Sequence, residues 1–120
     1  MGYQGAFEAG MLDPIAGQLE HYLDLLSTRQ KLVASNIANM DTPGYHTRDI
    51  DFQTEFQGAL RGTPQTVEVA GLAMKNDGNN VSIDRESRLL AENALRFQMA
   101  SNLIRSQVRA VRSAIQEGRS

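Results

Sequence analysis

Apolar residues recur at helical spacing through residues 13–40. Placed at about 100° per residue, one set falls within about 40° of a single line along a helix: Ile15, Leu19, Tyr22, Leu26, Val33, Ile37 and Met40. This pattern predicts an amphipathic helix over residues 13–40. Asp13 is a favoured N-cap and Pro14 suits the first helical position, where its missing N–H costs least, so residues 1–12 are expected to form an N-terminal extension.

A second apolar row runs through residues 84–117. Its members are spaced alternately four and three residues apart, which is the heptad rhythm of a coiled-coil seam: Leu90, Ala94, Phe97, Ser101, Ile104, Val108, Val111 and Ile115. Asp84 is a candidate N-cap and Gly118 a candidate C-terminal stop. The pattern predicts a C-terminal helix about 50 Å long at 1.5 Å per residue.

The middle segment, residues 41–83, is rich in turn signals, which interrupt any long helix. They cluster at Pro43-Gly44, Gly62-Thr63-Pro64 and Asp77-Gly78-Asn79-Asn80. The spacing of Phe52, Phe56 and Leu60 predicts a short helix, residues 66–69 alternate like a short strand, and residues 77–80 fit a hairpin tip or a flexible loop. The predicted fold is mainly α, with two long terminal helices packed as a coiled-coil-like hairpin and room for a small β-hairpin in the middle of a single domain.

Each helix also carries apolar residues away from its seam. The simplest arrangement packs the two helices only on each other, which explains one apolar row per helix and leaves a second set without a partner: Leu25, Leu32, Leu95, Met99 and Leu103. Burying such a side chain is worth roughly 1.5–3 kcal/mol. We therefore expect the second set to contact neighbouring subunits. Arg29 interrupts the first seam, so it either snorkels to water or pairs across to a carboxylate on a neighbour.

Composition excludes several classes of function. The 120-residue chain has no cysteine, which removes disulfides and thiolate metal sites, and its net charge of −2 disfavours general affinity for nucleic acid. The first 13 residues contain acids and no lysine or arginine, so a cleavable signal peptide is not expected, and no apolar run is long enough to span a bilayer. A basic row at Arg105, Arg109 and Arg112 suits either a nucleic-acid-contacting helix or the charged flank of a coiled coil, and the second interpretation is favoured.

The residues that could carry out catalysis do not converge in the sequence. His21 and His46 lack a metal-binding pattern, and Asp49 and Asp51 are expected to be solvated or capping groups. Ser35 lies within the predicted helix and not in a nucleophile elbow. No catalytic residue, cofactor or metal is predicted. A small enzyme would require a concave site with convergent polar groups.

The end of the first helix and the turn after it form the most distinctive string of the chain. It comprises Ala34, Ser35, Asn36, Ile37, Ala38 and Asn39, followed by Thr42, Pro43, Gly44 and Tyr45. Pro43 presets one backbone angle and Gly44 supplies the positive φ of a type II turn. Asn36 and Asn39 share a helix face, and their amides are expected to bond the returning loop or an adjacent subunit.

This string, in its place near the N-terminus, closely resembles the signature of bacterial flagellar axial proteins, the rod, hook and filament-junction family. Three further segments resemble the proximal rod branch of that family: Asp51-Phe52, residues 91–98 and residues 112–115. The resemblance covers roughly residues 15–117. His46 departs from it, because the family commonly has a lysine or arginine after the tyrosine.

The resemblance implies a noncatalytic structural subunit of the flagellar basal-body rod that assembles through its terminal helices into a torque-transmitting tube. The ten signature residues would then be an assembly motif. It also implies export through the flagellar type III apparatus and a periplasmic place near the inner-membrane ring. Implied partners are further copies of the chain, rod proteins of the FlgC, FlgF and FlgG type, the rod-to-ring adaptor FliE and the export gate. The alternatives are another axial rod protein, such as one of the FlgC type, and a nucleic-acid-binding helical hairpin.

Overall fold

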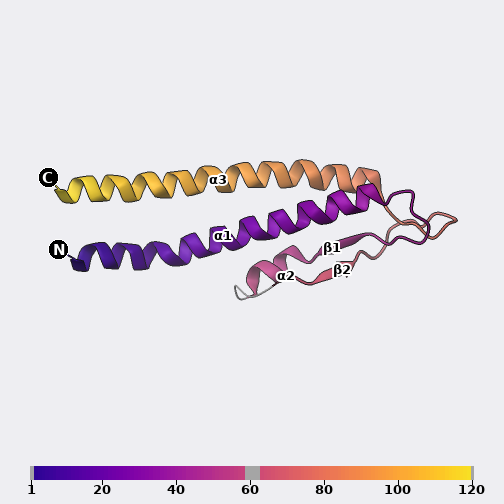
Figure 1. The fold of residues 1–120 in the computed structure, drawn as a ribbon, viewed down its shortest axis with the longest axis horizontal. Coiled ribbons are helices and arrows are strands. Elements are labelled where there is room, and N and C mark those ends of the chain that lie inside the picture. Colours follow the sequence, from indigo (N-terminus) through magenta and orange to yellow (C-terminus); the bar gives the residue numbers. More distant parts are fainter. Residues whose placement is uncertain (1, 59–62, 120) are drawn as a thin grey trace.

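The computed structural model describes the backbone of residues 2–58 and 63–119, and the side chains of residues 14–58 and 63–118. Its elements are α1 (Gly2–Ala38), β1 (Arg48–Ile50), α2 (Phe52–Gln57), β2 (Thr66–Glu68) and α3 (Ile83–Arg119). The molecule is elongated, measuring 70 × 24 × 18 Å. Figure 1 shows α1 and α3 side by side, with both chain ends at one end of the molecule and the connecting loops at the other. The predicted helical hairpin with a small two-stranded sheet in its middle segment is confirmed.

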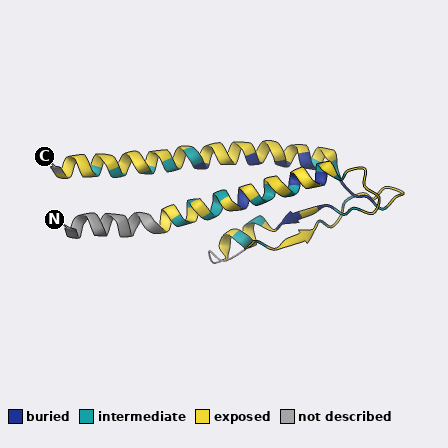
Figure 2. Cartoon of the chain, in the orientation of Figure 1, coloured by how far each residue is buried: buried dark blue, intermediate teal, exposed yellow. Residues whose placement is uncertain are grey.

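The helix α1 lies between two neighbours. It packs against α3 on one side and against β1 and α2 on another, so the middle segment folds back along α1 (Figure 1). Leu25, predicted to contact another subunit, is fully buried within the chain, and Leu32 is half-buried. The prediction was wrong for Leu25 because the chain's own middle segment covers the second apolar face of α1. Figure 2 shows that buried residues gather toward the loop end, whereas most of α3 is exposed.

The seam between the long helices differs from the heptad prediction on α3. Leu26 and Val33 of α1 are buried as expected, and Leu89 and Ala100 are the buried apolar residues of α3. The predicted seam residues Leu19, Tyr22, Ile37, Ile104 and Val111 are half-buried. Others lie beside the seam with 40–50% of their surface exposed: Ile15, Leu90, Phe97, Val108 and Ile115.

In the half of α3 nearer the loops, the buried residues lie one position before the predicted ones, and a polar contact accounts for this difference. Asn93 is buried in the seam, where its Nδ2 donates to the carbonyl oxygen of Leu26 at 2.7 Å and to Oε1 of Gln30 at 3.2 Å. An amide in this position needs such partners, because a buried polar group without a hydrogen bond is costly. The small side chain of Ala100 lies on the same face.

Both long helices have ends that differ from the predicted caps. The first begins at Gly2 and contains Pro14 in its interior, so Asp13-Pro14 does not mark its start. An interior proline removes one backbone hydrogen bond and bends or weakens a helix without always ending it. The second begins at Ile83, capped by Ser82, whose Oγ accepts from the Arg85 N–H at 3.3 Å, and it continues through Gly118 to Arg119.

The middle segment contains the predicted short elements. Asp51 caps α2 by accepting from the Thr54 N–H at 3.3 Å, while Leu60 lies outside the described residues. The strands β1 and β2 are antiparallel, with Arg48 opposite Glu68, and they are joined through α2. The tip predicted at residues 77–80 is not a free loop, since Asn79 is fully buried. None of the described helices combines the length and the apolar character that crossing a membrane requires.

The turn after α1 predicts the effect of substituting Gly44. Its φ is +76°, and the Tyr45 N–H donates to the Thr42 carbonyl at 3.2 Å, as the predicted type II turn requires. A Cβ at Gly44 would meet nothing within 4 Å, so the cost is conformational. We expect Gly44→Val to lower the free energy of unfolding by about 1–3 kcal/mol and Gly44→Asn by less, measured by denaturant titration. Equal losses for the two variants would contradict this origin.

Candidate assembly surface and the polar junction that positions it

Asn36 joins three parts of the chain at the loop end of the molecule. Its side chain is fully buried. Its Oδ1 accepts from the Arg48 backbone N–H at 3.1 Å and from the Tyr45 hydroxyl at 2.9 Å, while its Nδ2 donates to the Arg48 carbonyl at 2.8 Å and to Glu86 Oε1 at 3.2 Å. One amide therefore holds the last turns of α1, the edge of β1 and the first turn of α3. The prediction that it bonds the returning loop is confirmed.

Asn79 makes similar hydrogen bonds to the turn that follows α1. Its Nδ2 donates to the carbonyls of Asn39 and Thr42, both at 2.8 Å, and the Gly44 N–H donates to the Asp77 carbonyl at 2.9 Å. Both carbonyls belong to the turn that follows α1, so this asparagine supplies the turn with donors for its backbone oxygens. The loop before α3 is thus fixed to the turn after α1.

Two arginines and two acids form a buried charge cluster beside this junction. Arg29 donates to both oxygens of Asp49, Nε to Oδ1 at 3.0 Å and Nη2 to Oδ2 at 3.1 Å. Arg85 of α3 bridges Asp49 Oδ2 at 2.6 Å and Glu86 Oε1 at 2.8 Å. The second oxygen of Glu86 has no hydrogen-bond partner among the described residues. Arg29 therefore pairs within its own chain, and Asp49 is neither solvated nor a cap.

The ionisation of Asp49 reflects these contacts. Burial alone would raise its pKa, but hydrogen bonds from Arg29, from the Ile50 N–H and from Arg85, with the positive charge of Arg29, outweigh burial and lower the pKa from 3.8. The carboxylate is thus held ionised, as charge-assisted and bidentate hydrogen bonds favour. This cluster links α1, β1 and α3.

An aromatic group attaches α2 to α1. Tyr22 makes edge contacts with Phe52 and Phe56, at ring-centroid distances of 5.4 and 5.5 Å. His21 stacks on Phe56 and shares a 2.8 Å hydrogen bond with the Glu55 carbonyl. His46 lies at the surface, 3.4 Å from Glu68 Oε2. In the part of the chain that the structure describes, no group of three His, Asp or Glu side chains has a metal-binding arrangement.

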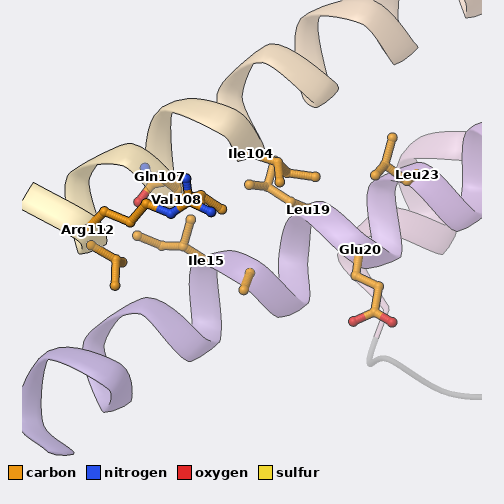
Figure 3. Close-up of a pocket in the computed structure, with 10 residues that line it drawn as sticks. Ile15, Leu19, Glu20, Leu23, Ile104, Gln107, Val108 and Arg112 are labelled. Carbon is orange, nitrogen blue, oxygen red and sulfur yellow. The ribbon is translucent and has the colours of Figure 1, made fainter. Parts of the chain in front are cut away.

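Beyond this junction the hairpin exposes apolar residues on both flanks of its seam. Leu95, Met99 and Leu103 are 60%, 64% and 47% exposed, and with Tyr22 and Phe56 they border a groove of about 880 Å³. A second groove of about 500 Å³ lies on the other flank between Leu19, Leu23, Ile104 and Val108 (Figure 3). These surfaces lie toward the end of the hairpin that carries the chain termini.

The structure brings the signature residues together in two groups. Asn36, Asn39, Thr42, Gly44 and Tyr45 take part in the junction hydrogen bonds. The smaller residues on the outer face of the helix, Ala34, Ser35 and Ala38, are exposed, as is Pro43. The partners of the signature were not identified from the sequence. Asn79 and Asn80 looked like turn residues, and Arg85 and Glu86 looked like residues of an ordinary first helical turn, so no local pattern marked them as partners.

Comparison with known proteins identifies the family. A family model described as flagella basal body rod protein matches residues 23–46, the stretch that contains Asn36 and the turn. The rod protein FlgB of Salmonella typhimurium strain LT2 is 33% identical, covering 90% of this chain and 99% of its own length. The chain belongs to the FlgB family of flagellar basal body rod proteins.

Two further relatives carry the same name. FlgB of Yersinia enterocolitica is 33% identical over 90% of this chain and 100% of its own length. FlgB of Escherichia coli K12 is 31% identical over 90% of this chain and 99% of its own length. The predicted axial family and its proximal rod branch are confirmed, and the chain is a structural component of the flagellar basal body rod.

The lowered pKa of Asp49 predicts acid-sensitive stability. A depressed folded-state pKa contributes stability above the unfolded-state value, and this is lost as the pH falls through the folded-state value. We expect the free energy of unfolding to decrease as the pH falls below about 3.8. Asp49→Asn should weaken this dependence and cost roughly 3–5 kcal/mol at neutral pH, because it leaves the two arginines without their shared anion. Denaturant titration at several pH values measures both effects.

Asp51→Asn is the matched control, since Asp51 is exposed and asparagine also caps helices well. A loss as large as that of Asp49→Asn would contradict the role assigned to the cluster.

Asn36 and Asn39 provide a second matched pair. Asn36→Ala should lower the free energy of unfolding by about 1–3 kcal/mol or more, because the Arg48 N–H loses its acceptor. Asn39→Ala should cost less, since its side chain bonds only Ser35 and Thr42 nearby in sequence. Circular dichroism during denaturation gives the comparison. Similar losses would show that the buried amide has no special role.

Proposed function

We propose that this rod protein polymerises through α1 and α3 to form part of the torque-transmitting axial tube, and that it acts without catalysis. The observation that carries the proposal is the exposed apolar surface of α3. Leu95, Met99 and Leu103 are exposed on α3, and the N-terminal end of the same helix takes part in the polar junction. An apolar row of this kind on an elongated chain marks a protein contact.

The free energy available from such contacts is large. Fully burying a leucine or methionine side chain is worth roughly 1.5–3 kcal/mol, so covering side chains that are 47–64% exposed is worth roughly half of that for each. Both grooves run along the hairpin, so helices of neighbouring subunits have apolar walls against which to pack. Contacts between different faces of identical subunits extend into rings or helical assemblies. A tube built this way suits a rod.

The junction supports the mechanical side of the proposal. Hydrogen bonds fix direction as well as distance, so the Asn36, Asn79 and Asp49 contacts hold α1, α3 and the middle segment as one body. Torque applied to one helix would then pass to the other. The exposed part of the signature, including Ser35 and Pro43, is proposed to contact a neighbouring subunit, which completes its role as an assembly motif.

The wider setting follows from the family. We propose that residues 1–120 act as a single rod-type domain, exported through the flagellar type III apparatus. The domain would lie in the periplasmic rod near the inner-membrane ring. Its proposed partners are further copies of itself, FlgC-, FlgF- and FlgG-type rod proteins, the adaptor FliE and the export gate. Cells that lack the protein should form the membrane ring and no rod.

Replacing Leu103 with glutamate tests the assembly surface. Leu103→Glu should leave the helicity of the purified chain unchanged, because the side chain is half exposed. In cells that lack the native protein it should block rod formation, since an unpaired charge buried in a subunit contact costs several kcal/mol. Rods are counted in isolated basal bodies.

Met74→Glu is the matched control, because Met74 is a similarly exposed apolar residue of the middle segment. Its rods should be normal. Normal rods with Leu103→Glu would overturn polymerisation through this surface of α3.

A further inference from the structure

The two long helices carry opposite charge toward their open ends. Within residues 2–28, α1 contains four acids and no lysine or arginine: Glu8, Asp13, Glu20 and Asp24. Within residues 96–119, α3 contains five arginines and one acid, Glu117: Arg96, Arg105, Arg109, Arg112 and Arg119. The small net charge of −2 therefore conceals a strong separation of charge between the helices.

Five of these charges form no ion pair with one another among the side chains that the structure describes. Glu20, Asp24, Arg105, Arg109 and Arg112 are exposed, and none of them takes part in the ion pairs found among the described residues. Glu20 and Arg112 border the same groove. Figure 3 shows, however, that the Glu20 carboxylate points away from α3.

The helical spacing gathers each set on one face. Glu20 and Asp24 are four residues apart, and Arg105, Arg109 and Arg112 follow at intervals of four and three, so each set lies on one side of its helix. Counting from the buried Leu26 and Ala100, both sets lie about 120–180° around their helices. Each charged face thus begins at the edge of the groove that flanks the seam, where Glu20 and Arg112 lie, and continues away from the seam. The middle segment packs elsewhere on α1, against His21 and Tyr22, and leaves the acidic face uncovered.

We propose that the acidic face of α1 in one copy contacts the basic face of α3 in the next copy. This inference rests on the proposed function and assigns the faces and the polarity of the contact. Pairing two identical faces would bring like charges together, which is unfavourable. When each contact joins a single α1 face to a single α3 face, one α1 face and one α3 face stay free at the ends of any row of subunits, so assembly continues.

The occupant that fits the arginine row is a second copy and not a nucleic acid. Val108 and Phe97, 45% and 50% exposed, flank the arginines on the side toward the seam and offer an apolar contact that a phosphate backbone does not use. The acidic helix next to α3 would also repel a polyanion. A second copy supplies both the acids and the apolar residues, the latter including Leu23 beside Glu20.

Charge reversal provides the experiment. One variant carries Arg105→Glu with Arg109→Glu, a second carries Glu20→Lys with Asp24→Lys, and a third combines all four changes. Each is produced in cells that lack the native protein, and rods are counted in isolated basal bodies. The first and second variants alone should give at least about tenfold fewer rods, since like charges then meet at every contact. The combined variant, and co-production of the first two, should restore them.

Arg88→Glu, at an exposed arginine nearer the loop end of α3, is the control and should assemble normally. Circular dichroism of each purified variant should show unchanged helicity. Normal rods with either reversed pair alone would overturn the inference, as would failure of the combined variant and the mixture to recover. A nucleic-acid partner would also overturn the inference. In that case Arg105→Glu with Arg109→Glu would abolish binding of a duplex oligonucleotide, while Glu20→Lys with Asp24→Lys would leave the rods normal. None of these results alters the Leu103→Glu outcome, which tests polymerisation separately.

Discussion

The fold depends on one buried amide. Asn36 lies where the last turns of α1, the start of β1 and the first turn of α3 converge, and it makes two hydrogen bonds to β1, one to α3 and one to the Tyr45 hydroxyl. A buried asparagine satisfied on both ends specifies one arrangement, because any other leaves polar atoms without partners. The neighbouring contacts of Asn79 and Asp49 extend the same constraint to the turn and the sheet. Apolar packing then only has to hold the helices together, and it does so with few fully buried side chains: Leu25, Leu26 and Val33.

The molecule therefore has two parts: a base at the loop end, where many hydrogen bonds and ion pairs join the segments, and a pair of helix ends with few buried residues. At the base, hydrogen bonds and ion pairs connect segments up to 50 residues apart in sequence, as between Asn36 and Glu86. Beyond Ala100, residues 101–118 of α3 are exposed or half-buried. This distribution is unusual for a domain that must be stable alone, and it suits a subunit whose remaining apolar surface is covered on assembly.

Local sequence signals predicted the helices, the strand and the turn well, but they predicted contacts between distant segments poorly. The two helices, the positive φ of Gly44 and the strand at residues 66–68 followed from periodicity and turn chemistry. Periodicity gives directions around a helix but does not say what covers each direction, so Leu25 was assigned to a neighbouring subunit when the chain's own middle segment covers it. The seam of α3 was misplaced because Asn93, a polar residue, faces α1. The Asp49 cluster joins residues 20 and 36 positions apart, and no local pattern marks such a pairing.

Because the polar junction lies at one end of the hairpin, a small change of angle there causes a large displacement at the other end. The junction lies at one end of a molecule 70 Å long, and the exposed α3 surface extends toward the other (Figure 1). At a distance of about 50 Å along a helix, a change of about 5° in the angle between α1 and α3 moves the helix tip by roughly 4 Å, about three quarters of the 5.4 Å rise of one helical turn. A fixed lattice of subunits tolerates little error of that kind. The directional hydrogen bonds of Asn36 thus fix the angle between α1 and α3 at the loop end, and this angle determines where the opposite ends of the helices lie.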